Sequence, residues 1–230
     1  MTHQQEHINL LLQIRTALEA ALQNQHWPES HRQHLLEAEQ SLKKIVIGRS
    51  SKPLIILDLN NVLIDRLYDA DRSHDVDHPQ ATRVGNFLVW TRPHLQSFLD
   101  FLFESFDVAV WSSVKAWNIE SLLPLVLGDH QSELKFVWSQ DQCQSVDNPD
   151  PEAKAPLFLK NLSEVWNAFP QYDESNTLII DDSLDKLQHN PDQCCWIPDK
   201  WSRDMTEDRQ LSDSGSFRQV LSHWHRVDVK

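Results

Sequence analysis

The stretch LIILDLNNVLID, residues 54–65, decides the fold of this chain. It begins with four apolar residues and then changes at Asp58 and Asn60 to side chains that carry oxygen. A short apolar run that ends in polar residues indicates a buried strand of a parallel sheet. Because ligands bind at the carboxyl ends of such strands, Asp58 is predicted to lie where it can meet a ligand.

The pattern of this first strand is repeated along the chain. Further short apolar runs predict strands at residues 107–111, 135–138, 177–180 and 194–197. Helical patterns separate them, at residues 93–105, 117–127, 157–169 and 216–225. This alternation predicts a three-layer, Rossmann-like α/β fold, in which crossover helices cover both faces of a parallel sheet.

Three polar segments interrupt the alternation, at residues 64–86, 139–156 and 199–214. The second and third are predicted to be surface loops. The first of them follows the first strand directly, so we expect it to form a loop or a small cap over the end of that strand.

Residues 1–50 precede the α/β pattern, which we assign to a domain of residues 51–230. Apolar residues recur at a helical period from Ile8 to Leu22 and again from Leu35 to Ile45, which predicts a helical hairpin. Two short helices are rarely stable alone in water. We therefore expect the hairpin to pack on the main domain as a lid, with a partner-binding coiled coil as the alternative.

Charge and composition narrow the classes of partner and compartment. Lys and Arg total 21 against 34 Asp and Glu, a formal charge of −13, which disfavours binding to nucleic acid. The count of three cysteines is odd and two of them are adjacent, which argues against a disulfide framework and for a reducing compartment, cytoplasmic or nuclear. No secretory signal or membrane-spanning run is present, so we expect a soluble protein.

Reactive side chains follow three of the predicted strands. Ser112 and Ser113 come after the second strand and Asp181 and Asp182 after the fourth, with Lys160 upstream of the fourth. Each alone has a simpler explanation: Ser112 as a helix N-cap, Lys160 as a solvated helix charge with Lys154 as competitor for its role, and the acidic pair as a turn. Their joint order favours one shared pocket with Asp58.

This order resembles that of the haloacid dehalogenase superfamily. The stretches Thr91–Ser113, Pro156–Trp166 and Thr177–Ser183 are similar to its CTD-phosphatase-like, or NLI-interacting-factor-like, branch. The likeness covers about residues 54–200. It implies the haloacid-dehalogenase fold with a small insertion after the first strand, and Mg²⁺-dependent hydrolysis of a phosphomonoester, either on a phosphorylated protein or on a small molecule.

The resemblance also implies a nucleophile and a metal site. Asp58 would attack phosphorus and form an aspartyl phosphate, which divides one difficult displacement into two easier ones. The ligands of Mg²⁺ would be Asp58, the main-chain carbonyl of Asn60 and Asp182, while Asp181 holds a metal-bound water. Oxygen ligands of this kind suit a hard cation.

Four further residues are implied to bind the substrate phosphate: Ser112, Ser113, Lys160 and Arg92. Their hydroxyl groups and positive charges would neutralise the equatorial oxygens of the transferred group. Arg92 has an alternative role as the anchor of the helix that follows it.

The chain departs from the family pattern at Asn60, where the family has an Asp that protonates the leaving group. General acid–base catalysis is worth about 10²–10⁴ in rate, and an amide cannot supply it. Two interpretations remain: a phosphatase that takes its proton from another group, such as Asp65 or another residue of 64–86, or a phosphatase-fold binding module without turnover. The retention of Asp58, Lys160 and both acids after the fourth strand favours the enzyme.

Overall fold

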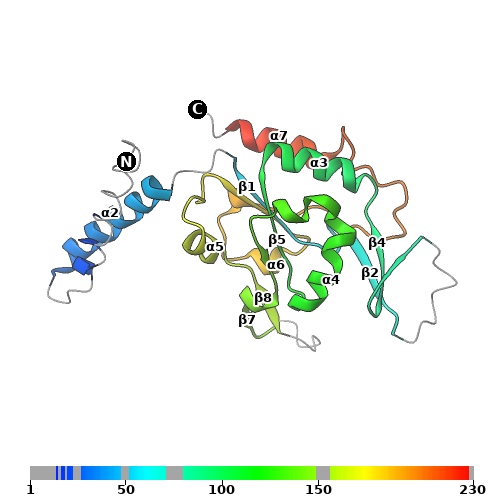
Figure 1. Ribbon diagram of the computed structural model, residues 1–230, viewed down its shortest axis with the longest axis horizontal. Coiled ribbons are helices and arrows are strands. Elements are labelled where there is room, and N and C mark those ends of the chain that lie inside the picture. The colour runs from blue at the N-terminus through cyan, green and yellow to red at the C-terminus, as the bar shows by residue number, and fades with distance from the viewer. Residues whose placement is uncertain are drawn as a thin grey trace. The chain divides into compact units, whose positions relative to one another are not determined.

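The structure is a computed structural model that describes residues 14, 17–18, 20–22, 27–47, 52–70, 80–148 and 156–227. The chain divides into two compact units. One consists of Met1–Ser51 with Ser163–Asp173, and the other of Lys52–Leu162 with Glu174–Lys230. The second unit contains the sheets and is shown with the rest of the chain in Figure 1.

The main helices and strands are named as in Figure 1. The helices are α2 (Glu29–Ile47), α3 (Leu95–Ser105), α4 (Ala116–Leu127), α5 (Leu162–Ala168), α6 (Leu184–Leu187) and α7 (Ser216–Val227). The strands are β1 (Leu54–Leu57), β2 (Ile64–Tyr68), β3 (Thr82–Val84), β4 (Phe87–Thr91), β5 (Asp107–Trp111), β6 (Val137–Trp138), β7 (Gln144–Val146), β8 (Leu157–Leu159), β9 (Thr177–Ile180) and β10 (Cys195–Trp196).

The main sheet has the strand order β10-β9-β1-β5-β6, and all four pairings are parallel. Strand β1 lies at the centre, with Leu57 opposite Ile180 on one side and Val110 on the other. The three central strands therefore end at the same edge of the sheet. This topology confirms the predicted parallel α/β fold, although the two outer strands are shorter than predicted.

Both faces of the main sheet are buried. Side chains of one face pack with those of α3, α4 and α7 in one apolar cluster. Its members from the main sheet are Ile55, Leu57, Val108, Val110, Leu178 and Ile180. In Figure 1, α7 lies beside α3, and the rings of Phe217 and Phe98 meet edge to face. The alternate residues of β1, Leu54 and Ile56, are also fully buried. Successive side chains of a strand point to opposite faces, so the sheet is covered on both sides as predicted.

The insertion after β1 is a second sheet rather than a loop. Strands β2, β4 and β3 form it in that order, with both pairings antiparallel. The loop alternative for 64–86 was wrong for β2 and β3. The IDRLY sequence of β2 places two charged residues side by side and has no alternating pattern that would reveal a strand. The second sheet has a small apolar cluster of its own, in which Leu88 and Trp90 of β4 pack with Trp201.

A second correction concerns the segment before α5. Strands β7 and β8 pair antiparallel, with Ser145 opposite Phe158. The predicted loop at 139–156 therefore contains a strand, and the predicted helix at 157–169 starts with one. Helix α5 begins only at Leu162. The segment 199–214 contains neither helix nor strand, as predicted.

The described part of the N-terminal region is helical except at Trp27 and Pro28. Helix α2 corresponds to the second predicted helix, and the described residues 14, 17–18 and 20–22 of the first are also helical. The rest of the first helix and Lys154 lie outside the described residues. The packing of this hairpin as a lid stays a prediction.

Two expectations about the whole chain can be compared with the structure. Cys143, Cys194 and Cys195 form no disulfide, in agreement with the odd cysteine count. Among the described residues, no helix has the length and apolar character required to span a membrane.

Candidate active site

The nucleophile candidate lies in a tight turn at the end of β1. The Asp58 amide donates to the Ile180 carbonyl at 2.9 Å, which continues the ladder to β9, and only 1 % of the residue is exposed. Asn61 then adopts a left-handed backbone with φ of 59°, a conformation that Asn tolerates better than most residues. Its amide donates to the Ile64 carbonyl at 2.7 Å, so the chain turns away sharply beyond Asp58.

Three carboxylates meet at this edge of the sheet. Asp58, Asp181 and Asp182 are all buried, and each offers an oxygen within 4.8 Å of those of the other two. Asp181 accepts the Ser183 amide at 2.9 Å, and Asp182 accepts the Asn61 side-chain amide at 3.0 Å. The structure thus brings together the acids predicted from the ends of two strands.

Lys160 is buried against the carboxylates. Its ammonium lies 3.3 Å from Asp58 Oδ1 and also donates to Asp181 Oδ2, and its side chain has no exposed surface. The residue lies between β8 and α5, where its amide donates to the Lys186 carbonyl at 2.9 Å and its own carbonyl accepts Asn190 Nδ2 at 2.7 Å. The alternative of a solvated helix charge is therefore wrong.

A second lysine completes the cluster, and the sequence analysis did not find it. The ammonium of Lys186, on the one-turn helix α6, lies 3.0 Å from Asp181 Oδ1, 3.3 Å from Asp58 Oδ2 and 3.4 Å from Asp182 Oδ1. Burial, the largest single influence, lowers the pKa of Lys186, but the attraction of the three carboxylates outweighs it and raises that pKa. The i,i+4 spacing from Asp182 was the one signal that could have revealed this contact.

The charges of this cluster do not balance. Three carboxylates face two buried ammonium groups, while Lys200, 3.5 Å from Asp182, has a side chain that is 66 % exposed. Asp58 Oδ1 is buried without a hydrogen bond to any described residue. A set of carboxylate oxygens with surplus negative charge fits a hard divalent cation such as Mg²⁺.

The electrostatics of Asp182 follow from its position at the rim of the cluster. Burial alone would raise the pKa of this carboxyl and is the largest single influence. The hydrogen bond from Asn61 and the charge of Lys186 act in the opposite direction, and the net effect is a lowered pKa. Asp182 therefore remains ionised through the neutral range.

Ser112 lies at the end of β5, beside β1. It is fully buried, its amide donates to the Trp138 carbonyl at 3.0 Å, and its hydroxyl has no hydrogen-bond partner among the described residues. Helix α4 begins at Ala116 with Lys115 at the N-cap position, so Ser112 does not cap it. Ser113 is half-buried beside it.

Arg92 is bound by other residues than those of the carboxylate cluster. Its side chain binds both carboxylate oxygens of Asp208 at 3.1 and 2.9 Å and the Val62 carbonyl at 2.9 Å, and it lies over the ring of Phe217. Only 1 % of the residue is exposed. These contacts favour the anchor role over contact with a substrate phosphate.

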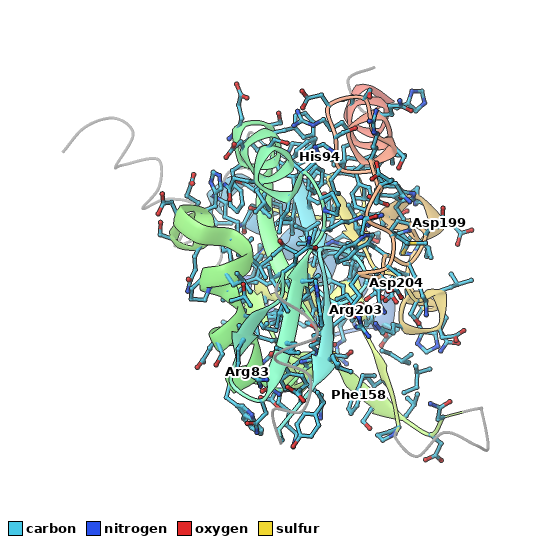
Figure 2. The ribbon with its side chains drawn as sticks, turned by 90° about the vertical axis from the view of Figure 1, so that its right-hand side faces the viewer. Arg83, His94, Phe158, Asp199, Arg203 and Asp204 are labelled. Carbon is cyan, nitrogen blue, oxygen red and sulfur yellow. The ribbon has the colours of Figure 1, made fainter. Side chains whose placement is uncertain are left out.

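Two more residues singled out in the sequence flank the turn after β1. Asn60 is half-buried, and its side-chain oxygen has no hydrogen-bond partner in the described part of the chain. Asp65 accepts the backbone amide and the guanidinium of Arg203, each at 3.0 Å. Figure 2 shows Arg203 beside the strands of the insertion. The carboxylate of Asp65 is therefore engaged in this ion pair.

A pocket lies between the insertion and α4. Its volume is about 260 Å³, and its lining residues are Arg66, Val84, Gly85, Asn86, Phe87, Trp117, Asn118, Ser121 and Leu122. The guanidinium of Arg66 lies over the Phe87 ring, and its Nη1 is buried without a hydrogen bond to any described residue. Burial lowers the pKa of Arg66, while the negative charge of Asp58 raises it to a smaller extent, so this cation lies within electrostatic reach of the nucleophile.

Three polar contacts attach the irregular segment after β10 to the turn that follows β1 and to the residues beside that turn. The Trp201 amide donates to the Asn61 carbonyl at 2.8 Å. Arg203 binds Asp65, and Asp208 binds Arg92. The turn that carries Asp58 is thus held from outside by residues far along the chain.

Comparison with known proteins identifies the family of this chain. Residues 53–229 match the family described as NLI interacting factor-like phosphatase. The chain belongs to this family. The membership confirms the resemblance drawn from the sequence, and it covers the sheet, the carboxylate cluster and the C-terminal segment.

Individual members of the family are distant in sequence. A ubiquitin-like domain-containing CTD phosphatase 1 of Drosophila melanogaster is 26 % identical over 153 residues, which are 66 % of this chain and 43 % of that protein. An FCP1 homology domain-containing protein of Schizosaccharomyces pombe is 27 % identical over 150 residues, 61 % of this chain and 58 % of that protein. The chain thus spans about half the length of these relatives.

Among solved structures, that of Fcp1, described as an essential RNA polymerase II CTD phosphatase, covers 83 % of this chain and 53 % of its own. The TM-score is 0.49 at 16 % sequence identity.

Proposed function

We propose that this protein is a Mg²⁺-dependent phosphomonoesterase that works through an aspartyl phosphate on Asp58 and acts on phosphorylated protein. The observation that carries the proposal is the convergence of Asp58, Asp181 and Asp182 on one buried position with surplus negative charge. A structural scaffold gains nothing from three buried carboxylates whose repulsion must be offset.

The chemistry assigned to the chain begins with Asp58. A carboxylate oxygen attacks phosphorus, the bond to the leaving oxygen breaks, and water later hydrolyses the aspartyl phosphate and releases phosphate. Lys160, 3.3 Å from Asp58 Oδ1, supplies positive charge where the phosphoryl oxygens lie. The Ser112 hydroxyl, which has no partner among the described residues, can donate to the same group.

The metal site is assigned to the carboxylates of Asp58, Asp181 and Asp182, together with the main-chain carbonyl of Asn60. Mg²⁺ bound there would offset the negative charge of the phosphoryl group during its transfer. The oxygen-only character of the donors is the support for this cation.

The amide of Asn60 determines which substrates react. It cannot protonate a leaving group, and Asp65, the alternative acid, is bound by Arg203 at 3.0 Å. Leaving groups that are already acidic need no proton in the transition state. We therefore infer that aryl phosphates and phosphotyrosine react faster than phosphoserine, and that the aspartyl phosphate is long-lived.

The pocket beside the insertion supports a peptide substrate. It combines the half-buried cation of Arg66 with Phe87 and with Trp117, which is 61 % exposed. Arginine and exposed aromatic side chains are the groups that most often anchor a partner at an interface. The residues that flank a phosphorylated side chain can therefore be held there, and the relative from Drosophila melanogaster is itself named a CTD phosphatase.

The proposal is tested with p-nitrophenyl phosphate and a phosphoserine peptide in the presence of Mg²⁺, using wild type, Asp58→Asn and Asn60→Asp. Asp58→Asn is expected to lower the rate by at least about 10³-fold, since the nucleophile is lost. Asn60→Asp restores the acid and should raise peptide hydrolysis by about 10²–10⁴-fold, with a smaller effect on the aryl ester. An unchanged rate in Asp58→Asn would reject the nucleophile assignment.

Asn60 itself favours a second candidate function, a phosphate-binding module without turnover. In that case wild type is silent in the assay, while Asn60→Asp is active. Binding without turnover would also appear as a rise in melting temperature with Mg²⁺ and beryllofluoride, because a ligand that binds only the native state stabilises it.

A further inference from the structure

The Lys186 ammonium lies among the three carboxylates of the cluster. It contacts one oxygen of each: Asp181 Oδ1 at 3.0 Å, Asp58 Oδ2 at 3.3 Å and Asp182 Oδ1 at 3.4 Å. Lys160 instead contacts the other oxygens of Asp58 and Asp181. Lys186 is therefore the cation placed among all three acids.

We propose that Lys186 is a tethered cation that fills the carboxylate site in the metal-free protein and must withdraw before a divalent cation binds. Lys186 would then set the metal affinity of the site and divide the protein between a lysine-filled resting state and a metal-loaded state. The inference rests on the metal site assigned under the proposed function.

The geometry of ligation makes the two cations mutually exclusive. An ammonium group contacts carboxylate oxygens at about 2.7–2.9 Å in a charge-assisted hydrogen bond, whereas Mg²⁺ requires its oxygen ligands at about 2.0–2.1 Å. Oxygens that close around Mg²⁺ leave no room for the ammonium among them. The repulsion between the two positive charges acts in the same direction.

The surroundings of the two lysines indicate which one moves. The side chain of Lys160 has no exposed surface, whereas that of Lys186 is 18 % exposed and lies at the rim. The backbone of Lys186 is fixed, since its carbonyl accepts the Lys160 amide at 2.9 Å and its amide donates to the Ser183 carbonyl at 3.2 Å. The withdrawal is therefore a change of side-chain rotamer toward solvent, with α6 in place.

The resting state follows from the same contacts. Without a cation, three buried carboxylates would repel one another. The Lys186 charge offsets part of this repulsion, so the acids can stay assembled while no metal is bound. Metal binding then replaces the Lys186 ammonium by a divalent cation, and the three carboxylates do not have to be brought together first.

The proposal is tested by isothermal titration of the full chain with Mg²⁺, and with Mn²⁺ as a spectroscopically visible substitute. Lys186→Gln removes the competing charge and should tighten metal binding by at least about tenfold. Lys186→Arg keeps the charge and should bind as weakly as wild type. Lys200→Gln is the matched control: it also removes a charge near Asp182, but from an exposed side chain, and should change the affinity by less than about twofold.

A second measurement does not depend on activity. In a chelator, Lys186→Gln should melt at a lower temperature than wild type, because the carboxylates lose a counter-charge, and saturating Mg²⁺ should raise its melting temperature more than that of wild type. Lys186→Met, of similar length and also neutral, replaces the Gln variant if circular dichroism shows the latter to be unfolded.

The outcomes separate this inference from the proposed function. Metal binding by wild type with equal or weaker binding by the neutral variants overturns the tethered cation and leaves the metal-dependent phosphatase intact. Binding by no protein in the set rejects both. Binding by the neutral variants alone supports the tethered cation in its strongest form and removes Mg²⁺-dependent turnover from the wild-type protein.

Discussion

Two buried groups of charges at the same end of the molecule differ in how completely they are paired. Arg92 and Asp208 form a closed unit: both carboxylate oxygens and the Val62 carbonyl accept from one guanidinium, and the charges cancel. The cluster around Asp58 is open, because three carboxylates face two ammonium groups and one oxygen of Asp58 has no hydrogen-bond partner in the described structure.

The difference separates charges that hold the fold from charges that we propose bind a cation. A buried pair whose donors and acceptors are all satisfied fixes two segments relative to each other. A buried cluster with surplus charge costs stability and is retained where chemistry requires it. A family resemblance alone would have placed Arg92 with the second kind, whereas its contacts place it with the first.

The largest expected effect comes from opening the closed pair. Arg92→Ala leaves the Asp208 carboxylate buried without its partner and should lower the free energy of unfolding by about 3–5 kcal/mol in urea denaturation. The double variant Arg92→Met/Asp208→Leu removes both charges and should recover part of that loss. A cost below about 1 kcal/mol for the single variant would show that the pair does not hold the fold.

Arg66 differs from both groups, because it is a half-buried cation with no ion pair in the described residues. Arg66→Gln should raise the KM for a phosphopeptide about tenfold, which corresponds to about 1.4 kcal/mol, with little change in kcat. Hydrolysis of p-nitrophenyl phosphate, which has no flanking residues for the pocket to bind, should change much less.

The control for this experiment is Arg209→Gln, which removes the same charge from an exposed position. An equal rise in KM in both variants would attribute the effect to net charge and remove the pocket from the substrate-binding surface.

The smallest expected effect is the pH dependence contributed by Asp182. Its pKa is lowered in the folded protein from the ordinary value of 3.8, so its contribution to stability is present above that value and is lost as the pH falls through the folded pKa. In a chelator, Asp182→Asn should make the stability fall less steeply between pH 5 and pH 2 in denaturation curves. Asp199→Asn, at an exposed position, should leave the wild-type profile unaltered.

The sequence predicted the main sheet because its strands are buried on both faces and are therefore apolar throughout. LIIL at β1 and TLII at β9 are such runs, and their ends located the acids correctly. The strands of the insertion and of the β7–β8 hairpin were missed, since half-exposed strands such as IDRLY carry mixed side chains and their backbone pairing leaves no mark on composition.

The residues of the candidate site that end strands were predicted, whereas those in short or irregular segments were missed. Asp58, Asp181, Asp182 and Ser112 end strands of one sheet, so topology alone assembles them. Lys186 was missed because a single lysine on a four-residue helix has no periodic pattern. The partner of Arg92 lies 116 residues later in an irregular segment, and no local rule could have identified it.

The segment between β10 and α7, which contains no helix or strand, limits how far the chain can be shortened from its C-terminal end. It supplies Trp201 to the Asn61 carbonyl, Arg203 to Asp65 and Asp208 to Arg92. A polypeptide cut after β10 would keep every strand of the main sheet and every residue to which we assign a chemical role. It would, however, leave the buried Arg92 guanidinium without its carboxylate partner, and the turn after Asp58 without its contacts to Trp201 and Arg203. The smallest fragment that keeps all the contacts around the turn after Asp58 therefore extends at least as far as residue 208.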